Sequence, residues 1–166
     1  MPITIGNFLV SEGTDSSDFK ISTPGKGYFG KGGDDSLWAD GKTYLPLNGV
    51  QYAIPSLLNG GSGNDEYTVA PGATVFVYDA SNSVNDSIHI YDYTKYITSL
   101  YSIDNRHVFF STSRGTNVFV IDALNARGCI EEVQFEDLAF SGLENSLRSF
   151  LSNYATLPDQ TFDNLI

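Results

Sequence analysis

Apolar residues in the first half of the chain recur at a nine-residue spacing. Phe19, Tyr28 and Leu37 are each nine positions apart, so all three are expected to face inward in successive half-turns of a coil. Apolar alternation over 3–10 predicts a leading strand. Such a coil alternates between two edges, and its turns on one edge recur every eighteen residues. We therefore expect residues 1–86 to form a short parallel coil.

The second half of the chain shows the pattern of ordinary antiparallel strands. Period-two alternation and β-branched or aromatic residues predict strands at Thr74–Tyr78, Ser87–Tyr93, Leu100–Asp104, His107–Thr112, Asn117–Asp122 and Ile130–Phe135. Residues 104–106 and 113–115 have the composition of hairpin turns. Helical spacing predicts a helix over Gly142–Tyr154. The expected fold class is all-β, with an antiparallel section and a C-terminal helix at 87–166, in one continuous domain.

Two segments of the predicted coil have nearly the same sequence. Gly30–Trp38 reads GKGGDDSLW and Gly60–Thr68 reads GGSGNDEYT, so both fit G-G-x-G-x-D-x-U-x, with Lys31 as the one departure. Asp35 rather than Asp34 takes the Asp position, because the large apolar position then falls on Leu37 instead of a serine.

The chemistry of this pattern points to a hard cation. Glycines permit a tight turn that points carbonyl oxygens inward, and the aspartate adds the anionic oxygen that calcium prefers. The candidate metal-site residues are Gly30, Gly32, Gly33, Asp35, Gly60, Ser62, Gly63 and Asp65.

The spacing of the two segments predicts an insertion between them. Gly30 and Gly60 are thirty residues apart, twelve more than one eighteen-residue repeat. The Asn48-Gly49 pair predicts that 41–55 form a protruding hairpin. The two turns would then stack directly, with one ion between them.

Further turns on the same edge are expected around this pair. Glu12–Lys20 lies two nine-residue units before Gly30–Trp38 and is either a degenerate turn of the same kind or an ordinary loop. Asp79 or Asp86 could close the lower face of a second ion site, and an Asx-rich turn is the other interpretation of these residues.

Composition restricts the class of protein. The 166-residue chain has a formal charge of -11 and a pI of about 4.3, which argues against nucleic acid or an anionic membrane as partner and favours a cation binder. Cys129 is the single cysteine, so no disulfide can form within the chain, and we expect a buried structural thiol. The N-terminus lacks the pattern of a Sec signal peptide, and no apolar run is long enough to span a bilayer.

The two nonapeptides resemble those of the RTX, or hemolysin-type calcium-binding repeat, family. Ile130–Asp137 is similar to a segment often found after such repeats. The resemblance implies a calcium-binding parallel β-roll that folds on binding extracellular Ca²⁺, with a structural, secretion or stabilising role. It also implies type I secretion through an uncleaved C-terminal signal, to which Phe162–Ile166 is similar.

Two other classes of function remain open. An enzyme is not expected, because G-x-S-x-G and H-E-x-x-H are absent and His89 and His107 have the pattern of ordinary surface residues, although carboxylate-pair chemistry stays possible. A calcium-dependent binding module of a secreted enzyme or adhesin is the alternative. Tyr91, Tyr93 and Tyr96, near Lys95, could stack on a polysaccharide or contact a surface protein, or could serve strand packing.

Overall fold

The chain is mainly β-strand, with one short helix near its C-terminus. The computed structural model describes residues 8–79, 85–124, 130–137 and 147–161. Several expectations lie outside these ranges: the thiol of Cys129, the N-terminal part of the leading strand, the first residues of the C-terminal helix, and the terminal segment Phe162–Ile166.

Short strands of mostly four residues make up the N-terminal part. They are β1 (Leu9–Glu12), β2 (Phe19–Ser22), β3 (Lys26–Phe29), β4 (Ser36–Ala39), β5 (Tyr44–Leu47), β6 (Val50–Ala53), β7 (Ser56–Asn59) and β8 (Glu66–Val69). The remaining elements are β9 (Thr74–Tyr78), β10 (Ser87–Ile90), η1 (Thr94–Tyr96), β11 (Ile97–Ile103), β12 (His107–Thr112), β13 (Asn117–Ile121), β14 (Glu132–Phe135) and α1 (Leu147–Tyr154).

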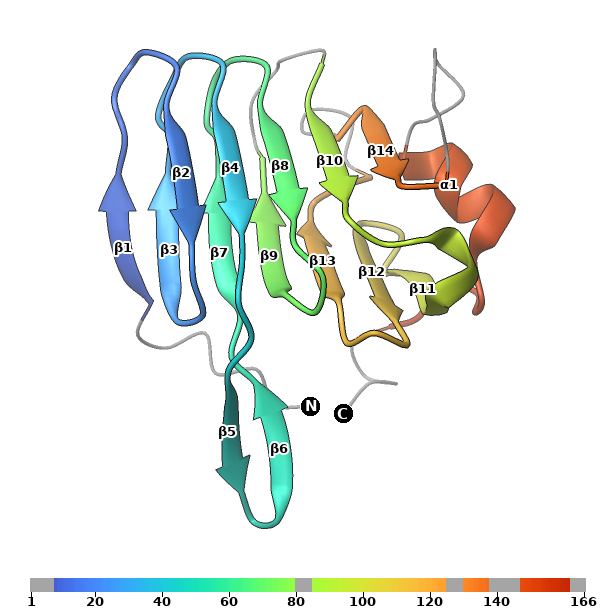
Figure 1. Cartoon of the computed structure of the whole chain (residues 1–166). Helices are drawn as coiled ribbons and strands as arrows, with labels where there is room; N and C mark the ends of the chain where they lie inside the picture. The colour runs from blue at the N-terminus through green and yellow to red at the C-terminus, as the bar shows by residue number, and fades with distance from the viewer. Residues whose placement is uncertain (1–7, 80–84, 125–129, 138–146, 162–166) are drawn as a thin grey trace.

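Two sheets face each other, and consecutive strands alternate between them from β1 to β4 and from β7 to β10, whereas β11, β12 and β13 follow one another in one sheet (Figure 1). One sheet has the order β1-β3-β7-β9-β13-β12-β11, and the other has the order β14-β10-β8-β4-β2. The pairs from β1 to β13 in the first sheet, and all pairs in the second, are parallel. Up to β10, each turn of the chain therefore adds one strand to each sheet.

The expectation of antiparallel pairing from residue 74 onward was wrong for three strands. β9, β10 and β14 pair in parallel, so parallel pairing continues past residue 86. Among the described residues from 74 onward, antiparallel pairing joins β11 to β12 and β12 to β13, and β13 also pairs in parallel with β9. Period-two alternation does not distinguish the two kinds of pairing. The boundaries also differ, since β10 ends at Ile90 and β11 already begins at Ile97.

Inward side chains form aligned rows that fill the space between the sheets. Leu37 on β4, Tyr67 on β8 and Ile88 on β10 lie in register and are fully buried. On the facing sheet, Tyr28 and Leu58 occupy one row with Val77 of β9 and Val120 of β13. This arrangement confirms the register in which Leu37 and Tyr67 take the apolar position of the nonapeptide.

The nine-residue row fails at its first member. Phe19 is 64% exposed, and its ring lies 6.1 Å from that of Trp38 on the outer face. Lys20 takes the inward row instead, in register with Leu37, and its Nζ lies 5.8 Å from the centre of the Tyr28 ring. Within the described chain β2 is an edge strand, so no further layer covers this position and a charged residue fits there.

The predicted insertion is a hairpin. β5 and β6 pair only with each other, joined by Asn48 (φ 52°) and Gly49 (φ 78°), whose positive φ values are those of a type I′ turn. The hairpin projects from the edge of the two sheets (Figure 1). Both expectations for 41–55, the hairpin and its protrusion, are confirmed.

The C-terminal end of the coil is covered by α1. Leu147 and Phe150 are its buried residues, and the Phe150 ring lies 5.9 Å from Phe110 and 5.3 Å from Phe135. These aromatic contacts join both sheets to the helix and close the core at this end.

Candidate metal centre

The two nonapeptide turns stack directly on one edge of the coil. Gly32 and Ser62 form a parallel bridge, and the Ser62 amide donates to the Lys31 carbonyl at 3.1 Å. The Asn64 amide donates to Oδ1 of Asp34 at 2.9 Å. The hairpin therefore leaves the stacking undisturbed, and the prediction of adjacent turns is confirmed.

A third turn lies on the same edge. The amide of Gly32 donates to the carbonyl of Thr14 at 3.3 Å, and the amide of Ser36 donates to that of Asp18 at 2.9 Å. Glu12–Lys20 is thus the degenerate turn that the spacing suggested. Lys31, the departure from the pattern, has the same left-handed backbone as Gly61, with φ of 80° against 96°.

A column of acidic side chains runs along the inside of these turns. In each step a backbone amide donates to the carboxylate of an acid in the following turn. The amides of Asp18, Asp35 and Asp65 donate to Asp35 Oδ1, Asp65 Oδ1 and Asp86 Oδ1 at 2.8, 2.9 and 2.8 Å. The Asp86 amide then donates to Glu131 Oε2 at 2.8 Å. We call these five residues the acid column.

Two oxygens of the acid column have no hydrogen-bond partner. They are Oδ2 of Asp35 and Oδ2 of Asp65, on side chains that are 2% and 1% exposed. A Cβ at Gly60 would overlap the Asp65 carboxylate, so glycine is needed where the carboxylate lies over the turn. A buried, ionised oxygen without a partner is costly, so a bound proton or cation would stabilise each of these positions.

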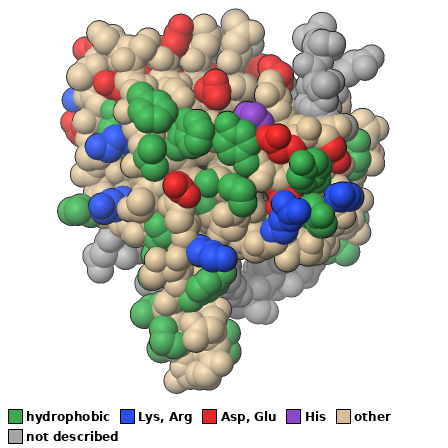
Figure 2. All heavy atoms as spheres, in the orientation of Figure 1, with side chains coloured by type: hydrophobic (Ala, Val, Ile, Leu, Met, Phe, Trp, Pro, Cys, Tyr) green, Lys and Arg blue, Asp and Glu red, His purple; other side chains and the backbone are tan. Residues whose placement is uncertain are grey.

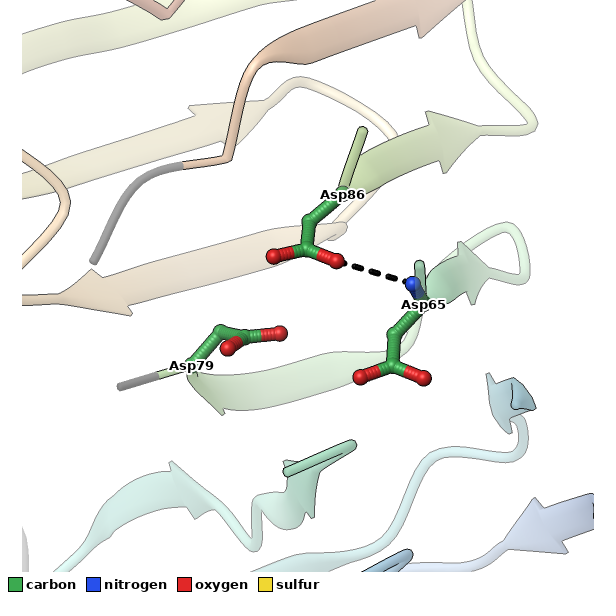
Figure 3. Close-up of side chains that lie close together, drawn as sticks. All are labelled: Asp65, Asp79 and Asp86. Atoms are coloured by element: carbon green, nitrogen blue, oxygen red, sulfur yellow. Dashed lines mark hydrogen bonds between the residues drawn. The ribbon is translucent and has the colours of Figure 1, made fainter. Parts of the chain in front are cut away.

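Three buried carboxylates converge at the C-terminal end of the row of stacked turns. One oxygen each of Asp65, Asp79 and Asp86 lies within 4.8 Å of the other two (Figure 3). Asp65 and Asp86 precede β8 and β10 of one sheet, whereas Asp79 follows β9 of the other. The structure therefore brings both additional acids of the sequence prediction to Asp65.

The hydroxyl of Tyr67 holds one of these carboxylates in place by a hydrogen bond. Its hydroxyl donates to Asp79 Oδ2 at 2.7 Å and accepts from the Gly60 amide at 2.8 Å. Burial and the neighbouring Asp79 carboxylate raise the pKa of Tyr67 well above its usual value, so the phenol stays a donor. The sequence indicated only an apolar role for this position.

The electrostatics of the acid column favour neutralisation. Burial, opposed by the hydrogen bond from the Asp35 amide and reinforced by neighbouring carboxylates, raises the pKa of Asp65 to about 7. Burial also raises the pKa of Asp35 and of Glu131. Oxygen ligands of this kind suit Ca²⁺, whereas zinc sites in proteins usually include nitrogen or sulfur ligands.

The other sequence candidates contribute to the turns in two ways. Gly30, Gly33 and Gly63 lie in the stacked turns and contribute only backbone atoms to them. Ser62 Oγ donates to the Lys31 carbonyl at 3.3 Å. Glu131 was not predicted as a site residue, because nothing local relates it to Asp86, 45 positions earlier.

The two histidines lie away from the acid column. His89 Nε2 is 3.3 Å from Glu136 Oε1, and His107 Nδ1 accepts from the Asp122 amide at 3.0 Å. Burial lowers the pKa of His107. Among the described residues, the group of three or more potential metal ligands is the aspartate triad, and neither histidine belongs to it.

The predicted aromatic surface divides into two groups. The Tyr91 ring lies 5.6 Å from Trp38, on the outer face of the five-stranded sheet. Tyr93 and Tyr96 lie 6.1 Å apart, with Lys95 Nζ 5.3 and 5.1 Å from their ring centres.

The fold and the acid column define a mainly β protein with a buried cluster of carboxylate oxygens that could bind a cation. Comparison with protein-family models, curated proteins and solved structures found no match. Within the described ranges, no helix is both long and apolar enough to cross a bilayer.

Proposed function

We propose that this chain is a secreted calcium-binding module of the parallel β-roll type, stabilised when its stacked turns bind extracellular Ca²⁺. The observation that carries the proposal is the pair of buried, unpartnered carboxylate oxygens of Asp35 and Asp65, which lie in adjacent turns. Two facing sheets support the roll, because their strands from β1 to β4 and from β7 to β10 alternate between them and pair in parallel.

Calcium fits these turns better than a proton does outside cells. Near neutral pH the raised pKa of Asp65 leaves the carboxylate partly ionised, and the Asp79 and Asp86 carboxylates lie beside it. A divalent cation removes this repulsion and supplies the missing partner. Extracellular calcium modules have dissociation constants of roughly 0.1–1 mM, which matches weak sites of this kind.

The role that follows is structural. A cation that binds the folded turns and not the unfolded chain adds its binding free energy to the free energy of unfolding. Calcium would therefore order the coil after export. The resemblance of the nonapeptides to RTX repeats supports export by a type I route.

Calcium is expected to raise the melting temperature of the full chain. One ion in 10 mM calcium, about ten to a hundred times such a dissociation constant, adds about 1.4–2.7 kcal/mol, which for a chain of this size corresponds to roughly 3–11 °C. Circular dichroism melts in a chelator and in millimolar calcium measure the shift. Magnesium is the matched control, because it requires tighter octahedral geometry and should give a much smaller shift. An unchanged melting temperature in calcium would refute the proposal.

A further inference from the structure

The outer face of the five-stranded sheet carries a continuous row of aromatic rings. The ring centres of Phe19 and Trp38 lie 6.1 Å apart, and those of Trp38 and Tyr91 lie 5.6 Å apart. The row ends at His89, whose ring centre is 4.5 Å from that of Tyr91. Figure 2 shows a row of hydrophobic side chains on this face, with a histidine at one end. Because Phe19, Trp38 and His89 belong to β2, β4 and β10, the row crosses the strands.

Packing on the sheet holds these rings in place. Thr68 takes the outward position between Trp38 and His89 and is in register with both. Its side chain is fully buried, although it lies on the outer face. The rings of Trp38, Tyr91 and His89 therefore cover Thr68 and lie along the sheet. Phe19 extends the row as a ring that is 64% exposed. The row is thus formed before any ligand binds, which lowers the cost of binding.

A polar row runs beside the rings. It consists of the first residues of four adjacent strands, which are in register: Ser36, Glu66, Ser87 and Glu132. Thr68 Oγ1 donates to Glu66 Oε1 at 3.4 Å, and Gln134 Nε2 donates to Glu132 Oε1 at 2.5 Å. Outward residues of one strand are two positions apart, so the polar row lies about 7 Å from the outward row that contains Trp38. An apolar strip and a strip of hydroxyl and carboxylate groups therefore run side by side.

The charges on this face are mainly acidic. The outward positions of its five strands, all of which the structure describes, hold no Lys or Arg. Four carboxylates lie in these strands or directly after them: Asp40, Glu66, Glu132 and Glu136. Figure 2 shows acidic side chains on both sides of the row of rings. A ligand of this face therefore meets hydrogen-bond acceptors and negative charge.

The cations near this face point elsewhere or are balanced by acids. Lys20 occupies the inward row of β2, in register with an inward leucine of β4. Arg114 Nε lies 3.8 Å from Oδ1 of the buried Asp92. Lys95 interacts electrostatically with Asp137. These groups leave the acidity of the two rows uncompensated, and an anionic ligand is disfavoured there.

We propose that the row of rings and the polar row together bind a chain of neutral sugars. A sugar ring has an apolar face of C–H groups, which stacks on an aromatic ring. Its hydroxyl groups lie at the edges of the ring and donate to the carboxylates of the polar row. The sugar chain runs across the strands, along the rings from Phe19 to His89. This site goes beyond the calcium module, since none of its contacts uses a metal ion.

The shape of the face favours a linear ligand. From β2 to β10 the row of rings crosses three strand spacings, so the two rows cover a strip about 14 Å long and 7 Å wide. A stable protein interface needs roughly 800 Å² per partner, which is far more than this strip offers. A second copy that docked through the same face would bring its carboxylates against these carboxylates. Nucleic acids and acidic polysaccharides are repelled for the same reason.

Fluorescence titration of the full chain with polysaccharides tests the proposal. Trp38 is the only tryptophan in the sequence, so its emission reports a ligand that stacks on the row of rings. The probes are three neutral polymers, mixed-linkage β-glucan, galactomannan and dextran, and the anionic polymer alginate, all in millimolar calcium. We expect a saturable change in emission with at least one neutral polymer and none with alginate.

Phe19→Ala should weaken sugar binding about fivefold or more, because it removes the most exposed ring of the row. Glu66→Ala should also weaken binding, since it removes an acceptor from the polar row. Tyr44→Ala is the matched control. It removes a ring that is 47% exposed on the β5–β6 hairpin, outside both sheets, so this variant should bind sugar like the original chain. Unchanged melting temperatures verify that each variant is folded.

Three results would overturn the proposal: no saturable change with any neutral polymer, an equal response to alginate, or equal effects of Phe19→Ala and Tyr44→Ala. A dimer in light scattering that Phe19→Ala dissociates, without sugar binding, would assign the face to a second copy and also overturn it. The melts in calcium and chelator test the calcium module separately. Sugar binding without a calcium shift would refute only the calcium module, and a calcium shift without sugar binding would refute only the sugar site.

Discussion

Replacing Asp65 by asparagine is expected to stabilise the calcium-free protein near pH 8 and to abolish most of its response to calcium. The amide retains an oxygen that can accept from the Asp35 amide, as Oδ1 of Asp65 does at 2.9 Å. It removes a charge that is buried beside Asp79 and Asp86. The same substitution removes an anionic ligand, so its effect on stability should change sign between chelator and calcium.

The pH dependence gives the size of this effect. The pKa of Asp65 is about 7 in the folded protein and near 3.9 in an unfolded chain, so between these values the folded state binds the proton more tightly. The free energy of unfolding of the calcium-free protein therefore falls as pH rises from about 4 to 7, and levels off above. Asp35 and Glu131 contribute in the same direction. Asp65→Asn should remove about 2–4 kcal/mol of this loss.

Denaturant unfolding in chelator across this pH range, and again in calcium, measures the prediction. Asp34→Asn is the matched control, because Asp34 is exposed and its Oδ1 only accepts from the Asn64 amide. It should leave both the pH profile and the calcium response nearly unchanged. A lower stability of Asp65→Asn in chelator near pH 8 would contradict a buried, poorly compensated carboxylate.

Gly63→Ala is expected to cost about 3–5 kcal/mol of stability and to weaken the calcium response. Gly63 has φ of 134°, a backbone conformation that alanine rarely adopts, and a Cβ there would overlap the carbonyl oxygen of Gly33 in the adjacent turn. The backbone penalty and the forced separation of the two turns act together. Because the clash is with backbone, rotation of a side chain cannot relieve it.

Gly49→Ala separates these two contributions. Gly49 also has a positive φ, 78°, but no atom lies within 4 Å of the position of its Cβ. Its cost should be limited to the backbone penalty of about 1–2 kcal/mol, with a normal calcium shift. Denaturant unfolding of both variants tests the difference. Equal costs would mean that the stacking of the turns contributes little to stability.

The sequence was sufficient for features that depend on local chemistry. Asp35 could be chosen over Asp34 because Leu37 then faces inward, and the structure buries both Asp35 and Leu37. Asn48-Gly49 likewise specified its hairpin, since few other dipeptides favour positive φ at both positions.

Features that depend on distant partners could not be predicted. The pairing of β10 with β14 joins segments that are 45 residues apart, and their alternation suits either direction of pairing. Phe19 matched the spacing of inward residues, but its strand lies at the edge of the described sheet, where no neighbour covers it. Only the three-dimensional arrangement brings Tyr67 to Asp79 and Glu131 to Asp86.

The acid column also has a direction. The amides of Asp18, Asp35, Asp65 and Asp86 are each held by a side chain that comes later in the sequence, and the last of these side chains belongs to Glu131. A chain that is synthesised from its N-terminus therefore cannot complete any of these turns until the following acid has been added. Each step can therefore close as soon as its own following acid has been made: the step at Asp18 waits only for Asp35, whereas the step at Asp86 waits for Glu131.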